Sequence, residues 1–147
     1  MGGHRARRAG TVGQMAGGAD SMRFEAVAEP ASLARLRQDL SDFLDAARAP
    51  EDLRFDVTLA VSEAANNVLQ HAFRRRSAPG RLRVVAAAGG GEIRVVVSDD
   101  GLGLSPRPDS PGAGLGLPVM ARLCHDLDVV AGAEGGTTVT MTWRTAA

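Results

Sequence analysis

The sequence predicts a two-layer α+β sandwich, in which helices cover one face of a mainly antiparallel sheet. The predicted elements follow the order strand, helix, helix, two strands, loop, helix, two strands. Strands and helices therefore do not alternate one for one, as they do in a doubly wound βαβ fold. The later strands come in two pairs with short connections that contain glycine, and strands joined in this way pair antiparallel.

The composition is typical of one soluble domain. The chain has 147 residues, with 17 basic and 17 acidic side chains, so it carries no net positive field toward nucleic acid or anionic lipid. No stretch approaches the roughly 20 apolar residues of a membrane-spanning helix. The single cysteine, Cys124, excludes an internal disulfide and suits a reducing compartment. We therefore expect a cytoplasmic protein without a direct nucleic-acid or membrane partner.

The first twenty residues differ from the rest of the chain. Residues 1–20 (MGGHRARRAGTVGQMAGGAD) are rich in Gly, Ala and Arg and show no apolar periodicity. No apolar run follows the basic cluster, which argues against a secretory signal. This pattern predicts a disordered tail that is dispensable for folding, followed by one domain over residues 21–147. A basic arm that touches RNA or DNA is the alternative function for this segment.

The first elements of the domain are a strand and two helices. Residues 22–27 (MRFEAV) alternate apolar and polar side chains, which predicts a half-buried strand. Pro30 is suited to open a helix because its missing N–H costs little there, and apolar residues continue at helical spacing to Ala47. Pro50 and the two acidic residues after it predict the start of a second helix, which reaches about Phe73.

The second half of the chain predicts two hairpins separated by a loop and a helix. Residues 81–88 and 92–99 are two apolar or β-branched runs joined by three glycines, which indicates an antiparallel hairpin. Residues 100–117 are dense in Gly and Pro and predict a loop. Residues 116–127 predict a helix with an apolar stripe, and residues 128–143 predict the final hairpin.

Polar side chains form a line on the second predicted helix. Glu63, Asn67 and His71 follow one another at steps of four, which keeps them on one face of a helix otherwise rich in Ala, Val and Leu. Two interpretations are open for this line: a binding site, or a face in contact with water. The role of His71 is left open between function and packing at the helix end.

Two glycine clusters follow this helix in the sequence. Asp99-x-Gly101-x-Gly103 comes directly after a strand, where the glycines allow a ligand to approach the backbone and the carboxylate can accept a hydrogen bond from an exocyclic amine. A simple surface turn is the alternative, because Asp-Gly is also a strong turn signal.

The second cluster opens the last predicted helix. Gly112-x-Gly114-x-Gly116 would leave backbone N–H groups free to bind phosphate. A long loop rich in proline precedes this cluster, which excludes a dinucleotide-binding fold, and no Gly-Lys-Ser/Thr occurs, which excludes the Walker phosphate loop.

The order and spacing of these elements, together with GGTTV at 135–139, resemble the ATP-binding domain shared by gyrase-type ATPases, Hsp90, histidine kinases and MutL, the GHKL superfamily. The resemblance covers about residues 22–143. Within the superfamily the chain looks most like the small stand-alone anti-sigma-factor serine kinases of bacteria. It shares with them SEAANN at 62–67, a short lid, and GLGL at 114–117 before Val119 and Met120.

This resemblance implies roles for individual residues. Glu63 would take the proton from an incoming hydroxyl, Asn67 would coordinate Mg²⁺ that bridges the phosphates of ATP, and Asp99 would read the adenine amine. The other residues implied to contact the nucleotide are Gly101, Gly103, Gly112, Gly114, Gly116, Leu117 and Thr138.

The implied activity is that of an ATP-dependent serine/threonine kinase that also acts as an anti-sigma factor. Such a protein binds a sigma factor, phosphorylates an anti-anti-sigma partner of the STAS type, and commonly forms a homodimer. The chain departs from some family members at Ser110 and Pro111, where they carry an arginine; Arg107 in the lid is a candidate substitute. This departure keeps an alternative open: a non-catalytic nucleotide-binding module that sequesters a regulatory protein.

Overall fold

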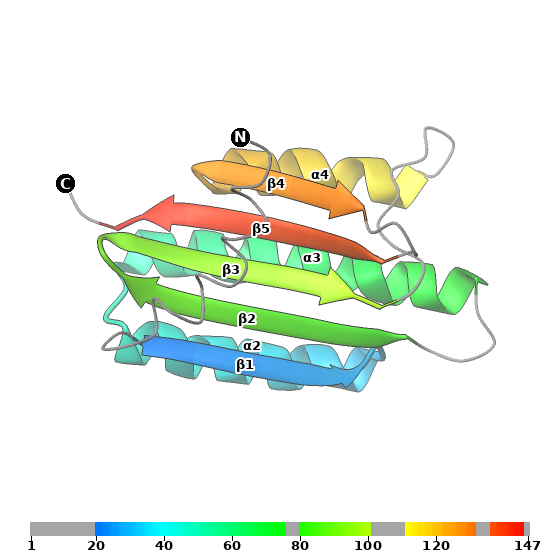
Figure 1. Ribbon diagram of the computed structural model, residues 1–147, viewed down its shortest axis with the longest axis horizontal. Helices are drawn as coiled ribbons and strands as arrows, with labels where there is room; N and C mark the ends of the chain where they lie inside the picture. Colours follow the sequence, from blue (N-terminus) through cyan, green and yellow to red (C-terminus); the bar gives the residue numbers. More distant parts are fainter. Residues whose placement is uncertain (1–19, 76–79, 101–110, 132–135, 146–147) are drawn as a thin grey trace.

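The computed structural model describes residues 20–75, 80–100, 111–131 and 136–145, and for residues 71–75 and 111–116 it describes the backbone alone. Figure 1 shows the arrangement: the strands form one sheet, and the helices all lie against the same face of it. The other face of the sheet carries no helix from the described part of the chain. The two-layer α+β sandwich predicted from the sequence is confirmed.

The sheet has five strands in the order β1-β2-β3-β5-β4, and every neighbouring pair is antiparallel. The elements, in chain order, are β1 (Asp20–Val27), α2 (Pro30–Ala46), α3 (Glu51–Arg75), β2 (Arg81–Gly89), β3 (Glu92–Asp99), α4 (Pro111–Leu123), β4 (Asp126–Ala131) and β5 (Thr137–Arg144). In the part of the chain that the structure describes, no helix is long and apolar enough to cross a membrane.

The predicted starting points of β1, β4 and α4 differ from the structure; β4 begins at Asp126 rather than at residue 128. β1 begins at Asp20, so the tail predicted over residues 1–20 overlaps this strand by its last residue, and residues 1–19 lie outside the described part. α4 begins at Pro111, so the loop predicted over 100–117 is wrong from Pro111 onward. Each glycine lowers helix propensity by about 1 kcal/mol, which is why the pattern indicated a loop. Packing of α4 against α3 overrides that propensity.

α4 also ends earlier than the sequence predicts, at Leu123 rather than at residue 127. Past this point the backbone N–H of His125 donates to the carbonyl of Thr142 at 2.9 Å, which turns the chain from the helix into the β4–β5 pair. The indole Nε1 of Trp143 donates to the carbonyl of Leu123 at 2.7 Å. This bond satisfies one of the carbonyls that a helix end leaves without an intrahelical partner.

The hydrophobic core lies between the sheet and the helices. A cross-strand row of Phe24, Val84, Val97 and Val139 is in register across four strands, and all four side chains are buried. The helices contribute buried leucines from α2 and small residues from α3, which let α3 lie close to the sheet. The buried residues of these two helices include Leu36, Leu40, Leu44, Val57, Ala60, Val61, Ala64, Ala65 and Val68.

The connection between α2 and α3 fixes where α3 begins. Arg48 has a positive φ of 57°, in the left-handed region that commonly ends a helix. Its N–H donates to the carbonyl of Asp45 at 3.0 Å, and the N–H of Ala49 donates to the carbonyl of Leu44 at 3.1 Å. This tight reversal lets α3 start at Glu51 and run back along the sheet in one uninterrupted helix.

Candidate functional site

Four parts of the chain that carry predicted site residues converge at one end of the molecule. Figure 1 shows the end of β3, the start of β5, the second half of α3 and the first turn of α4 at this end. These elements also contact one another, because α3 packs directly against β3, β5 and α4. The structure therefore brings together the second half of α3, which follows Glu63 and contains Asn67, the end of β3, which carries Asp99, and the first turns of α4.

The polar line of α3 does not simply face water. Asn67 is only 5% exposed, and Glu63, one turn before it, is half-buried. A helix face in contact with water would leave both side chains well exposed, so the structure contradicts that interpretation for Asn67. His71 lies on the next turn, within the part of α3 for which only the backbone is described.

Asp99 lies on the helix-covered face of the sheet. Side chains alternate between faces along a strand, and the buried residues before it on β3 are Ile93, Val95 and Val97. Asp99 continues that set at the end of the strand and is half-buried. The carboxylate is therefore directed to the side of the sheet on which α3 lies.

Thr137, rather than Thr138, shares this face with Asp99. Thr138 is paired with Ser98 in the β3–β5 register, so it lies on the opposite face from Asp99. Thr137 is 4% exposed and belongs to the buried set of β5 with Val139. The sequence already indicated this orientation, because the apolar residues at 139, 141 and 143 show that the odd-numbered residues of β5 face the core.

The strand ends that carry Asp99 and Thr137 are held close together. Gly136 has a positive φ of 84°, and a Cβ at this position would lie 2.7 Å from the carbonyl oxygen of Asp99, so only glycine fits there. The next residue, Asp100, accepts a hydrogen bond on Oδ1 from the backbone N–H of Arg81 at 2.9 Å. Asp100 thus connects the end of β3 to the start of β2. Asp99 is the residue of this pair that belongs to the candidate site.

The glycine-rich segments are described only in part. Gly101, Gly103 and Arg107 lie outside the described residues. The second cluster lies within the first turns of α4 rather than before it, and Leu117 is half-buried and packs against the core. The first N–H groups of a helix have no intrahelical partner and favour anions, so the start of α4 is a suitable place for phosphate. The glycines implied to lie there are Gly112, Gly114 and Gly116.

The candidate metal ligand, Asn67, fits a metal ion that is bound by phosphate oxygens as well as by the protein. Asn67 offers a single amide oxygen, and Mg²⁺ prefers oxygen ligands, retains several waters and usually binds through phosphates as well. Among the described residues there is no group of three or more His, Cys, Asp or Glu side chains that could hold a metal ion. Asn67 is therefore suited to a metal that arrives with the nucleotide.

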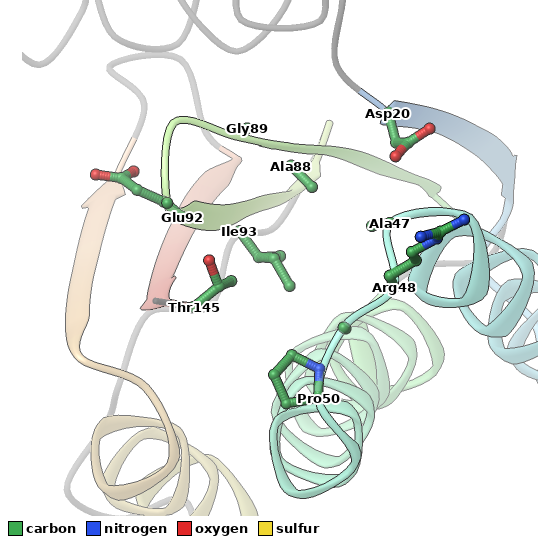
Figure 2. Close-up of a pocket in the computed structure, with 11 residues that line it drawn as sticks. Asp20, Ala47, Arg48, Pro50, Ala88, Gly89, Glu92, Ile93 and Thr145 are labelled. Carbon is green, nitrogen blue, oxygen red and sulfur yellow. The ribbon is translucent and has the colours of Figure 1, made fainter. Parts of the chain in front are cut away.

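A cavity of about 380 Å³ lies at the other end of the sandwich. Figure 2 shows it between the α2–α3 connection and the β2–β3 turn, with Ala88, Ile93 and Pro50 among its lining residues. β3 begins here at Glu92 and reaches the candidate site only at Asp99. None of the predicted site residues lines this cavity.

The free thiol of Cys124 is not part of the candidate site. Burial raises the pKa of the Cys124 thiol above its ordinary value, and the nearby carboxylate of Asp126 raises that pKa further. The thiol donates to the carbonyl of Met120 at 3.1 Å. A thiol with a raised pKa stays protonated near neutral pH and is a weak nucleophile.

Comparison with known proteins identifies the family. The sequence pattern of the histidine kinase-like ATPase domain matches residues 26–143. The chain belongs to this family. The GHKL resemblance deduced from the helix and the two glycine clusters is thereby confirmed, and the matched range is close to that of the resemblance, about 22–143.

Two relatives that resemble the chain are named as a serine-protein kinase and an anti-sigma factor. The chain is 32% identical over 135 residues to the serine-protein kinase RsbW of Staphylococcus epidermidis, and the match covers 82% of each chain. It is 25% identical to an anti-sigma F factor of Shouchella clausii, over 81% of this chain and 87% of that one.

A solved structure of an RsbW domain has the same fold as this ATPase family member. The crystal structure of the RsbU and RsbW domains of Rv1364c from Mycobacterium tuberculosis matches with a TM-score of 0.68 and 26% sequence identity. The match covers 84% of this chain and 32% of that chain.

Proposed function

We propose that this protein is an ATP-dependent serine/threonine kinase that acts as an anti-sigma factor. The observation that carries the proposal is the buried Asn67 with Glu63 one turn before it, on a helix that packs against β3 and α4. An amide for the metal, a carboxylate for the proton and a helix start for the phosphates are the parts that phosphoryl transfer needs. The relatives named serine-protein kinase and anti-sigma F factor support the same activity.

The nucleotide is held between the end of β3 and the start of α4. Asp99 accepts a hydrogen bond from the adenine amine, and Thr137 takes the position on the adenine side that the resemblance assigned to Thr138, because Thr137 shares the face of Asp99. The first N–H groups of α4 bind the phosphates. Asn67 would hold a Mg²⁺ ion, which when bound would neutralise charge on the phosphates.

Glu63 acts on the acceptor hydroxyl. The oxygen of the substrate serine or threonine forms a bond to the γ-phosphorus, the bond from this phosphorus to the β–γ bridging oxygen breaks, and ADP leaves. The hydroxyl proton passes to the Glu63 carboxylate, which is half-buried and one helical turn from the metal ligand. Alignment of the acceptor hydroxyl with the γ-phosphate supplies most of the remaining increase in the rate of transfer.

The protein partners follow from the same activity. The chain holds a sigma factor inactive and transfers phosphate to a STAS-type anti-anti-sigma protein, in the cytoplasm. It does so as a homodimer. β1 is an edge strand with no described strand on its outer side, and such an edge can pair with a second copy. Sedimentation equilibrium should give twice the monomer mass, and a monomer mass at all concentrations would contradict the dimer.

The kinase activity is tested by transfer of labelled phosphate. The chain is incubated with Mg²⁺, γ-labelled ATP and a panel of recombinant STAS-type proteins, and label is followed on each protein. We expect label on a serine or threonine of at least one panel member. A rise in melting temperature with ATP, without transfer to any panel member, would instead support the non-catalytic binding module. Ser110 and Pro111 stand where some family members have arginine, and the missing arginine favours that rival.

A further inference from the structure

Two apolar side chains of α3 are exposed although the helix has a large buried face. Phe55 is 67% exposed and Leu59 is 36% exposed. Single apolar residues on a surface need no explanation, but these two lie one turn apart and form a pair. Phenylalanine is scarce in this chain, which has four, and exposure leaves its large apolar area in water.

This pair lies on the line that leads to the candidate catalytic residues. Phe55, Leu59, Glu63 and Asn67 follow one another at steps of four, and each step advances about 6 Å along the helix and rotates about 40° around it. The exposed fraction falls along this line from 67% at Phe55 to 36% at Leu59 and 5% at Asn67, with Glu63 half-buried between the last two. The line therefore winds from the open surface into the site.

The surroundings of the pair carry more acidic than basic side chains. Glu51 and Asp52 are exposed, Asp56 is half-buried, and all three lie within about one turn of Phe55. The neighbouring Arg54 is paired with the carboxylate of Asp45. Farther along the helix, toward α2, Arg37 donates through Nε to the Oγ of Ser62 at 3.3 Å. An apolar pair flanked by carboxylates complements a segment that carries apolar and basic side chains.

We propose that Phe55 and Leu59 form a docking ridge for the protein substrate, and that this ridge directs the acceptor hydroxyl to Glu63. The proposal rests on the kinase activity proposed above. Leu59 and Phe55 lie about 6 and 12 Å from Glu63 along the helix axis. An extended chain advances about 3.3 Å per residue, so these distances correspond to about two and four residues of substrate.

This spacing specifies the chemistry of the substrate segment. In an extended chain, residues two and four positions from the acceptor point to the same side as the acceptor itself. The segment therefore places apolar side chains at these two positions on one side of its serine or threonine, with arginine or lysine nearby to face Asp52 and Asp56. The occupant is the phosphorylated partner, rather than the sigma factor or a second copy of this chain.

The test compares Phe55→Ser and Leu59→Ser with Val130→Ser, in the full-length protein. Val130 is a suitable control because it is 48% exposed but lies on β4, paired with Thr138 on the sheet face that no described helix covers. The substrate is the STAS-type protein that the unaltered chain phosphorylates fastest in the panel. Steady-state transfer, ATP affinity and melting temperature are measured for each variant.

We expect the two ridge variants to raise KM for the protein substrate by about tenfold or more, as the loss of an apolar anchor does in other interfaces. Their kcat at saturating substrate should stay within about twofold, because the ridge binds substrate and transition state alike. Melting temperature and ATP affinity should not change, and Val130→Ser should match the unaltered chain throughout. Phe55→Leu should restore most of the affinity for substrate.

Each other result overturns the proposal in a distinguishable way. An unchanged KM in both ridge variants, with transfer intact, overturns the docking ridge and leaves the kinase activity standing. Loss of only sigma-factor binding, or of only self-association in sedimentation, would likewise overturn the docking ridge and leave the kinase activity standing. Absence of transfer by the unaltered chain to every panel member overturns the ridge together with the proposed kinase function.

Discussion

Replacement of Glu63 by glutamine should lower phosphoryl transfer by about 10²–10⁴, the usual contribution of a positioned general base. Glutamine keeps the shape of the side chain but cannot accept the proton of the serine hydroxyl. ATP affinity should stay within about 1 kcal/mol of the unaltered chain, because no ligand contact is lost. Initial rates with labelled ATP and calorimetry measure the two quantities separately, and the variant should still bind its sigma factor.

Asn67→Ala is the matched comparison, one turn farther along the same helix. It should lose the Mg²⁺-dependent part of ATP affinity together with transfer, because the amide oxygen is the only protein ligand proposed for the metal. Its side chain is buried, so its melting temperature must be compared with that of the unaltered chain. Wild-type rates of transfer in Glu63→Gln would show that the base assignment is wrong.

Asp99→Asn should weaken the binding of adenine nucleotides by about 1.5–3 kcal/mol, the typical value of a hydrogen bond to a charged group. This corresponds to a roughly 10-fold to 100-fold rise in Kd. Asparagine fills nearly the same space, but it removes the charge that strengthens the bond from the adenine amine. Calorimetry with ADP and Mg²⁺ measures the change, and the effect on guanine nucleotides should be much smaller.

Asp100→Asn is the control for this prediction. The amide oxygen of an asparagine can still accept the hydrogen bond that Arg81 donates through its backbone N–H, so the β2–β3 connection is preserved. Nucleotide affinity should therefore be nearly unchanged in this variant. Equal affinities for Asp99→Asn and the unaltered chain would contradict the assignment of Asp99 to the adenine amine.

Much of the fold and part of the candidate site could be predicted from local patterns. The order of elements specified the sandwich, and the steps of four on α3 selected Glu63 and Asn67, which the structure shows half-buried and buried. The start of α4 could not be predicted in this way. Three glycines argue locally for a loop at Pro111 and beyond, and the packing against α3 that makes the segment helical is a tertiary effect.

The choice between Thr137 and Thr138 shows a limit of prediction from motifs. A motif match assigned the second threonine, whereas the alternation along β5 places only the first on the face of Asp99. Strand parity was available in the sequence and supports the proposal of Thr137, because a shift of one residue moves a side chain to the other side of a sheet. The exposed Phe55 was not predictable as a surface residue, since helical periodicity does not say how much of a wide face is covered.

The close approach of Gly136 to Asp99 makes the candidate site depend on a residue that takes no part in its chemistry. The two residues are far apart in the chain, because α4 and β4 lie between β3 and β5, yet a Cβ at position 136 would lie 2.7 Å from the carbonyl oxygen of Asp99. Any side chain at position 136 would therefore displace the strand end that carries Asp99. A substitution at Gly136 would change the shape of the site without removing any group that contacts a ligand.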